Sequence, residues 1–220
     1  MKPHPCEIDS PSVVLIGNFN PKIFQPGWLA KYELVSDDAA RAATIEIIRP
    51  EISAFTVHEE LRFVVELGRC IVESKTPRHE QTVLDLVRGC FGLLEHSPIQ
   101  AMGINRAMHF RMPDEDAWHR LGHRLAPKRS WSGLLEQTGT RSVTIEGKLP
   151  GCPATYTVTV EPSSLVPHGV FIRTNEHHAF EPSAGATAPM KTLADRWDRS
   201  QASARKFAEE LIERCEEENP

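Results

Sequence analysis

One succession of elements occurs twice along this chain, and it limits the folds that the chain can adopt. Each half starts with an apolar strand, continues through a short helix into alternating strands, and closes with a long amphipathic helix. Letters also match at three places, which are Gly17 with Gly103, Trp28 with Trp118, and residues 41–46 (RAATIE) with residues 141–146 (RSVTIE). Chance matches of this length are common, but the order of elements in the two halves agrees even where the residues differ. We therefore favour an internal duplication.

The elements themselves are identified by hydrophobic spacing. Period-two alternation is typical of half-buried strands, and apolar residues spaced by three and four are typical of amphipathic helices. The expected strands cover residues 13–16, 43–48, 61–72, 99–110, 143–145, 156–160 and 170–172. A short helix is expected to begin near Pro26, and longer helices are expected at residues 77–94, 114–125 and 191–217. Residues 182–189 are expected to form a linker.

These elements predict an α+β protein. Two pseudo-repeated modules, each a strand, a short helix, three strands and a long helix, are expected to form one curved antiparallel sheet with the helices packed on one face. We expect a mobile tail at residues 1–11, a first module at residues 12–97 and a second module at residues 98–220, with one shared core. The layout resembles the TATA-binding-protein-like and helix-grip shapes, a likeness of topology that implies no function.

The second module opens with a short segment, Gly103-Ile104-Asn105-Arg106. In this segment, in chain length and in element order, the chain resembles a sporadically distributed group of bacterial proteins with an L-R-Y-I-N-like segment at the corresponding place. The resemblance implies a bacterial cytosolic protein from a mobile or defence-type gene neighbourhood, and it implies no particular activity.

Composition limits which partners the protein is expected to bind and in which cellular compartment it is expected to lie. The formal net charge of -5 argues against non-specific binding to phosphate backbones, which needs a concentrated basic face. The first residues hold no apolar core of a secretory signal, and no apolar run reaches the roughly 20 residues of a membrane helix. Five scattered cysteines without a C-x-x-C pair indicate reduced, structural thiols. We expect a cytoplasmic protein that binds no membrane.

Two histidines on the expected helix at residues 114–125 form a candidate metal site. His119 and His123 are four residues apart, so their rings share a helix face, and His109 lies nearby in sequence as a third ligand. The segment reads W-H-R-L-G-H and holds no H-E-x-x-H motif. Because the chain has 10 histidines, a chance pair at this spacing is common, and solvent-facing or packing histidines are the favoured interpretation. No cofactor is expected.

Positive charge gathers in one segment between two tryptophans. Trp118 and Trp131 flank a basic cluster made of Arg120, His123, Arg124, Lys128 and Arg129. Such a cluster can bind phosphate or nucleic acid, or it can dock an acidic protein surface, because Trp and Arg are common hot-spot residues. The alternative is a solvated helix face whose tryptophans belong to the core. The acidic net charge favours this alternative over nucleic acid.

Polar turns occupy matching places in the two modules. Asn18 and Asn20 follow the first strand, and Asn105 and Arg106 hold the corresponding place in the second module. If the duplication holds, a pseudo-twofold axis relates these turns, and they could line a shared ligand site with Arg106 as its anion anchor. Asparagines that only supply turn hydrogen bonds and left-handed conformations are the simpler explanation.

Two functions from different classes fit these patterns. The first is a non-catalytic binding module, an accessory or adaptor subunit that docks another protein through Trp118, Arg120, Arg124, Lys128, Arg129 and Trp131. The second is a metal- or small-molecule-binding enzyme with a site between sheet and helices, lined by His109, His119, His123 and Arg106. The sequence holds no cysteine paired with a base, no G-x-S-x-G elbow and no glycine-rich phosphate loop, so the first function is favoured.

Overall fold

The computed structural model describes residues 4–216, and this part of the chain contains nine strands and five α-helices. In chain order the elements are β1 (Cys6–Gly17), α1 (Pro26–Lys31), α2 (Asp37–Arg41), β2 (Thr44–Arg49), β3 (Ile52–Val57), β4 (Leu61–Glu66), β5 (Arg69–Ser74), α3 (Glu80–Leu93), β6 (Ile99–Arg111), α4 (Glu115–Leu125), β7 (Val143–Gly147), β8 (Thr155–Pro162), β9 (Gly169–Ala179) and α5 (Thr187–Glu216). Short 3-10 turns η1 (Pro77–His79), η2 (Lys128–Trp131) and η3 (Pro182–Ala184) complete this part of the structure.

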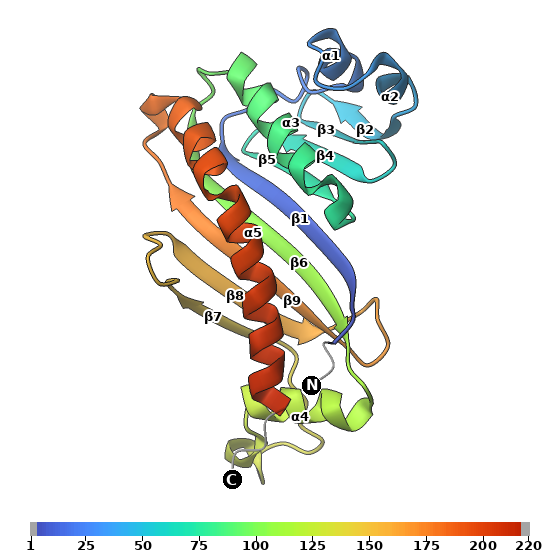
Figure 1. Cartoon of the computed structure of the whole chain (residues 1–220), viewed down its shortest axis with the longest axis vertical. Coiled ribbons are helices and arrows are strands. Elements are labelled where there is room, and N and C mark those ends of the chain that lie inside the picture. The colour runs from blue at the N-terminus through green and yellow to red at the C-terminus, as the bar shows by residue number, and fades with distance from the viewer. Residues whose placement is uncertain (1–3, 217–220) are drawn as a thin grey trace. The chain divides into compact units, whose positions relative to one another are not determined.

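The strands form one sheet in the order β2-β3-β4-β5-β1-β6-β9-β8-β7 (Figure 1). The register is antiparallel from β2 through β5 to β1, and again between β7 and β8. The strand order is mirrored about the central β1–β6 pair. In the first module β5 lies beside β1 and β2 lies at the sheet edge, and in the second module β9 lies beside β6 and β7 lies at the other edge. The predicted α+β fold, with two similar modules and helices packed against an antiparallel sheet, is confirmed.

The first module holds one helix and two strands more than the ranges above predict, because the expected strand at residues 61–72 divides into β4 and β5 and because β3 is additional. Every residue of β3 except Ile52 is buried, so no alternation marks it. Both of its faces are covered: the Ser53 hydroxyl donates a hydrogen bond to the Phe24 carbonyl (2.5 Å), and Thr56 lies beside Glu46. A strand covered on both faces has no period-two signal.

The expected tail and linker are ordered in the described residues. Residues 6–11 form the first half of β1, and the Arg111 amide donates to the Pro5 carbonyl. In the expected linker, Gly185 has a φ of +65°, and a Cβ there would lie 2.4 Å from the Glu95 carbonyl. The next amide, of Ala186, donates to that carbonyl (2.8 Å). Residues 1–3 of the tail and residue 217 of the expected helix lie outside the described residues.

Helix α5 begins at Thr187, four residues earlier than predicted. Pro189 suggests a break, but it falls in the first turn of α5, where a backbone amide has no helical partner and proline is tolerated. The helix therefore includes the end of the expected linker.

Two compact units divide the described chain, and they differ from the two predicted modules. Unit 1 comprises residues 4–9, 106–175 and 202–216, and unit 2 comprises residues 10–105 and 176–201. The boundaries fall inside β1, β6, β9 and α5, which are long enough to contribute to both units. Each unit has its own hydrophobic cluster, in place of the one shared core that the sequence predicts.

In unit 2, α3 packs on the sheet and supplies one wall of the core (Figure 1). Its buried face consists of Val83, Leu84, Leu86, Val87, Cys90 and Phe91. Phe91 contacts the rings of Phe19 and Phe24, with centroids 5.6 and 5.9 Å apart, and so fixes the loop that follows β1. The first part of α5 adds Leu193 and Trp197 to this core.

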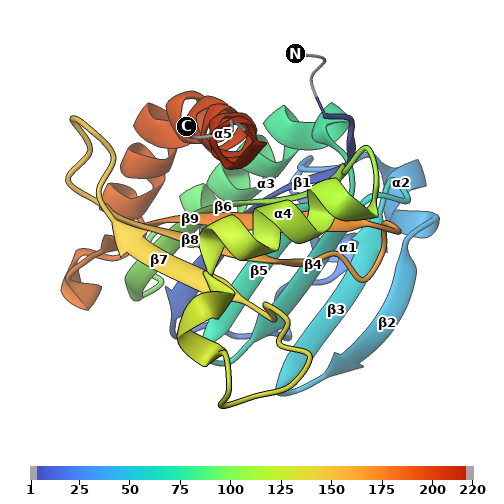
Figure 2. The ribbon, with the colours of Figure 1, turned by 90° about the horizontal axis from the view of Figure 1, so that it is seen from below.

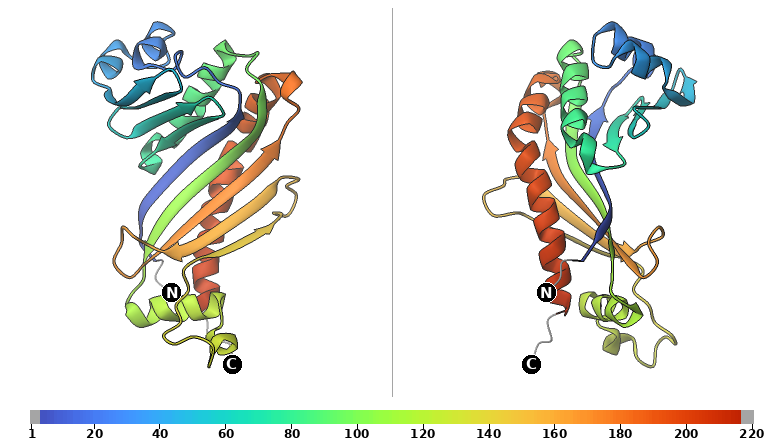
Figure 3. Two further views of the ribbon diagram at one scale, coloured as in Figure 1. Left: turned by 180° about the vertical axis from the view of Figure 1, so that it is seen from behind. Right: turned by 45° about the vertical axis from the view of Figure 1, so that its right-hand side comes forward.

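In unit 1, the second part of α5 lies against β6, β8 and β9, and α4 closes the same core (Figures 2 and 3). Tyr156, Val158 and Val160 of β8 face this core at every second residue. Helix α4 contributes Ala117 and Leu121. Among the described residues, no helix is long and apolar enough to cross a membrane.

Candidate ligand pocket

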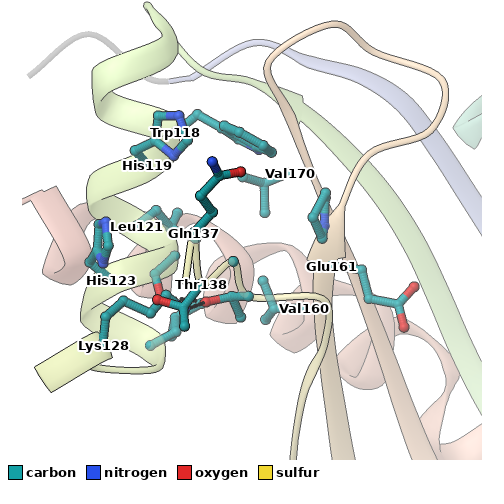
Figure 4. Close-up of a pocket in the computed structure, with 15 residues that line it drawn as sticks. Trp118, His119, Leu121, His123, Lys128, Gln137, Thr138, Val160, Glu161 and Val170 are labelled. Carbon is teal, nitrogen blue, oxygen red and sulfur yellow. Dashed lines mark hydrogen bonds between the residues drawn. The ribbon is translucent and has the colours of Figure 1, made fainter. Parts of the chain in front are cut away.

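A pocket of about 230 Å³ lies entirely in unit 1, between α4, the loop at residues 137–140 and the strands β8 and β9 (Figure 4). Its apolar lining is formed by Trp118, Leu121, Leu125, Val160, Pro162 and Val170. Its polar lining is formed by His119, His123, Lys128, Gln137, Thr138, Thr140 and Glu161. An apolar body with a few polar groups at its border is the usual composition of a small-molecule site.

Helix α4 supplies one wall, and its start is fixed by a side-chain cap. The Asp114 carboxylate accepts a hydrogen bond from the Ala117 amide at 2.7 Å, and Glu115 and Asp116 lie in the first turn, where negative charge stabilises a helix. The Trp118 indole Nε1 donates to the Gly169 carbonyl at 3.1 Å. This bond holds the ring in place, so the aromatic wall is formed before any ligand arrives.

The loop at residues 137–140 closes the opposite side. The Thr140 hydroxyl donates to the Gly122 carbonyl (3.0 Å) and accepts a hydrogen bond from the Lys128 ammonium, so three segments meet at one oxygen. Gln137 has a φ of 51°, a left-handed conformation that is uncommon outside glycine and asparagine. Its amide points into the space between Trp118 and Val170 (Figure 4).

The pocket lining holds one ammonium group, of Lys128, and one carboxylate, of Glu161. Lys128 forms no ion pair with a described carboxylate, and its ammonium has a neutral hydroxyl as its hydrogen-bond partner. Glu161 is the one carboxylate of the lining, and it accepts a hydrogen bond from Ser142 (3.1 Å) and points away from the pocket (Figure 4). An anionic group in the pocket would therefore meet Lys128 with little opposing charge.

The predicted histidines separate into two environments. His119 and His123 line the pocket, as residues of one helix face, whereas His109 is buried in β6 and stacks on Phe171 with centroids 4.7 Å apart. Among the described residues, no three His, Cys, Asp or Glu side chains gather in a way that could hold a metal ion. His109 is also not among the residues that line the pocket.

His109 does contact a hydroxyl, because its Nδ1 lies 2.8 Å from the Ser163 Oγ. That oxygen already accepts hydrogen bonds from the Leu165 and Val166 amides, at 3.1 and 2.9 Å. Both of its lone pairs are thus engaged, so Ser163 acts as a turn cap that donates its proton to His109, and it is a poor nucleophile. Burial also lowers the pKa of His109, which keeps the ring neutral.

The predicted site at the matched polar turns is not assembled. Asn18 directly follows β1, and its amide donates to the Pro98 carbonyl just before the start of β6. Asn105 lies six residues beyond the first residue of β6. Asn20 caps its own turn through the Lys22 amide, and the Asn105 side chain donates to the Gly103 carbonyl. Since six strand residues span about 20 Å, the two asparagine positions do not meet.

Arg106 is a buried structural residue. Its side chain has 0% exposure and forms an ion pair with Asp9 at 2.5 Å, and Arg205 of α5 approaches the same carboxylate oxygen at 3.4 Å. A guanidinium enclosed in this way neutralises Asp9 inside unit 1 and does not face a ligand. The cation that lines the pocket is Lys128, which the sequence placed in the docking cluster.

The basic segment between the two tryptophans contains residues that line the pocket and residues that are exposed outside it. Trp118 and Lys128 belong to the pocket, whereas Arg120, Arg124, Arg129 and Trp131 are exposed. The pocket also contains Gln137, Thr140 and Glu161, which no sequence motif marks because they come from a loop and a strand end. The one available signal was Gly139, which marks a turn beside them.

No family model and no curated protein matches this chain. A solved structure that resembles it is DynU16, a protein from the dynemicin biosynthetic locus, at 14% sequence identity and a TM-score of 0.27, with 92% of this chain and 98% of that chain covered. At this TM-score the similarity supports no conclusion about the fold or the function of this chain. The resemblance to a sporadic bacterial group stays a prediction.

Proposed function

We propose that this chain is a non-catalytic binding protein for a small molecule with an apolar body and an anionic head group. The observation that carries the proposal is the Lys128 ammonium, which stands at the border of a mainly apolar pocket without a carboxylate partner among the described residues. A carboxylate ligand would form a charge-assisted hydrogen bond there, the stronger kind of hydrogen bond.

The size of the pocket limits the ligand. Its volume of about 230 Å³ lies below the ~300 Å³ at which sites for drug-sized molecules begin. A short acyl chain or a single aromatic ring fits this space. Trp118 and Val170 on either side of the cavity favour a flat or flexible apolar group, with the Gln137 amide available for one further hydrogen bond.

Reversible binding agrees with the groups that are present. The pocket holds no pair of facing carboxylates, and the closest contact between a histidine and a hydroxyl in unit 1 lies at the turn-locked Ser163, outside the lining. The hydroxyl of Thr140 lies beside Lys128 in the lining, but it donates its proton to the Gly122 carbonyl and accepts from the Lys128 ammonium, so it is not activated as a nucleophile.

Calorimetry with matched ligands tests the proposal. Octanoate is expected to bind the full chain at neutral pH and low salt, octanol about tenfold more weakly, and octylamine not at all, because one charge-assisted hydrogen bond contributes about 1.5–3 kcal/mol. Lys128→Gln is expected to reduce octanoate binding to the level of octanol. Lys148→Gln, which changes an exposed lysine outside the pocket, is the matched control and should bind octanoate normally.

Equal affinities for octanoate and octanol, or unchanged octanoate binding by Lys128→Gln, would refute the anionic ligand. Absence of binding by octanoate, octanol and phenylbutyrate alike would refute an acyl or aromatic ligand in this pocket.

A further inference from the structure

Three large apolar side chains are exposed within five positions of the loop between α4 and β7. Trp131 is 50% exposed, Leu134 75% and Leu135 60%. Single exposed apolar residues are common on protein surfaces, but a contiguous group is typical of an interaction site. We call these three residues the Trp131 patch.

The loop presents the patch in a defined conformation. Trp131 ends the 3-10 turn η2, and its carbonyl accepts hydrogen bonds from the amides of Leu134 (3.0 Å) and Leu135 (3.1 Å). Gly133 between them has a φ of +78°, which a residue with a side chain adopts only with strain. Because these bonds fix the backbone, little conformational entropy is lost when a partner covers the patch.

A shallow groove adjoins the patch. It has a volume of about 480 Å³ and is lined by Ala126, Pro127, Arg129, Ser130, Trp131 and Leu134. A concave surface beside an exposed indole can receive a side chain from a partner, which is the arrangement of most protein hot spots. Insertion into a lipid surface requires protruding apolar groups and makes no use of a groove.

Arg129 lines the groove, and further basic residues lie near the patch in the sequence. Between residues 120 and 141 the chain has five basic residues, Arg120, Arg124, Lys128, Arg129 and Arg141, and one acidic residue, Glu136, although the net charge of the chain is -5. Arg120, Arg129 and Arg141 form no ion pair with any carboxylate of the described residues. Their charges are therefore available to a partner, and complementarity requires that partner to be acidic.

We propose that the Trp131 patch and its groove dock an acidic, amphipathic segment of another protein, with an apolar side chain of that segment in the groove and its carboxylates on Arg129 and the neighbouring basic residues. The segment is a separate ligand from the small molecule of the pocket, since the patch and the groove lie outside the pocket lining.

Fluorescence anisotropy with designed peptides tests this docking. The probe is a labelled amphipathic peptide of about 15 residues, in which successive Leu residues are spaced alternately by three and four positions and the other residues are Glu. A second peptide has Lys in place of every Glu. The full chain is expected to bind the Glu peptide at about 0.05 M salt, to bind it less at about 0.5 M salt, and to ignore the Lys peptide.

Variants of the chain locate the binding surface. Trp131→Ala and Arg129→Glu are each expected to weaken Glu-peptide binding about tenfold or more, as loss of a hot-spot residue does. Two controls change comparable exposed residues elsewhere and should bind normally: Leu165→Ala, which is 64% exposed, and Arg88→Glu on α3. All four positions are exposed, so unfolding is not expected, and circular dichroism checks it.

Four results would overturn the proposal. Trp131→Ala could bind the Glu peptide as well as the original chain, or the Lys and Glu peptides could bind equally. Vesicles of phosphatidylserine could bind through Trp131 where the peptide does not, which would assign the patch to a membrane surface. Sedimentation could show a dimer that Leu134→Glu dissociates, which would make a second copy of this chain the occupant.

Discussion

Glu176 is a charged residue that the fold buries completely, with 0% exposure of its side chain. Arg196 contacts both of its carboxylate oxygens, at 2.8 and 3.1 Å, and the His178 ring lies at 2.9 Å. Burial opposes ionisation, but hydrogen bonds from His178, Arg196 and Ser200 outweigh it and lower the pKa of Glu176 from 4.5 to about 2. The residue is therefore a carboxylate whose partners hold part of unit 2 together.

The lowered pKa predicts how stability depends on pH. Because the folded pKa lies below the unfolded value, Glu176 stabilises the fold fully above about pH 5, and this contribution is lost as the pH falls towards 2. Glu176→Gln should lower the free energy of unfolding by about 3 kcal/mol at neutral pH, since Arg196 and His178 then lose the charge of the buried carboxylate that they contact. It should also flatten the acid limb of the curve in urea titrations.

A surface pair supplies the control for that prediction. Glu66 and Arg69 form an ion pair at 3.1 Å, but both side chains are more than a third exposed. Glu66→Gln should change the free energy of unfolding by less than about 0.5 kcal/mol at any pH. An equally small effect of Glu176→Gln would show that the buried network contributes little.

At the scale of elements, α4 is both a core helix and a pocket wall, and its glycine is a weak point. Gly122 lies inside the helix, where glycine is less favourable than alanine by about 0.8–1 kcal/mol. A Cβ at this position would meet Thr140 at 3.7 and 3.8 Å, which is ordinary contact. The sequence shows that the helix is weakened there, but only the packing shows that a methyl group fits.

We expect Gly122→Ala to raise the free energy of unfolding by about 0.5–1 kcal/mol in urea titrations. The matched substitution is Gly89→Ala in α3, also within a helix, where the Cβ would lie 2.5 Å from a Leu34 methyl carbon. The clash should cancel the gain in helix propensity, so Gly89→Ala is expected to give no stabilisation. Stabilisation of similar size at both sites would show that packing does not limit either position.

At the scale of the whole molecule, α5 supplies residues to two separate hydrophobic clusters. Met190, Leu193 and Trp197 belong to the core of unit 2, while Ala204, Ala208 and Ile212 belong to the core of unit 1. A continuous helix transmits the loss of one cluster to the other, because its hydrogen bonds form cooperatively. The two units are therefore expected to unfold in one transition.

Ala202 is exposed near the middle of α5, where it can test this coupling. Ala202→Pro removes one helical hydrogen bond and should lower the free energy of unfolding by about 3 kcal/mol. Hydrogen exchange should then report different opening free energies for the segments around Trp197 and Ala208, which are expected to exchange together in the original chain. Ala202→Gln keeps the helix and should behave like the original, and separate opening of the two segments before substitution would disprove the coupling.

The kind and order of most elements follow from the hydrophobic pattern of the chain. Hydrophobic period is a local property, so it identified the strands around Val13, Ile45 and Val158 and the helices α3 and α4 without any knowledge of contacts. It also predicted an internal duplication, and the strand order is mirrored about the β1–β6 pair. It failed where burial covers both faces, as in β3, and where a proline falls in a helix's first turn, as in α5.

The contacts between polar residues, in contrast, could be known only from the folded chain. Lys128, Gln137 and Thr140 reach α4 from a loop without a motif, and Glu161 comes from the end of β8. Arg106 was expected to be an anion anchor because its positive charge can be read from the sequence. Its ion pair with Asp9 could not be predicted, because the two residues lie 97 positions apart in the chain. Secondary structure follows from neighbours in the chain, but a site depends on distances between residues that only folding brings together.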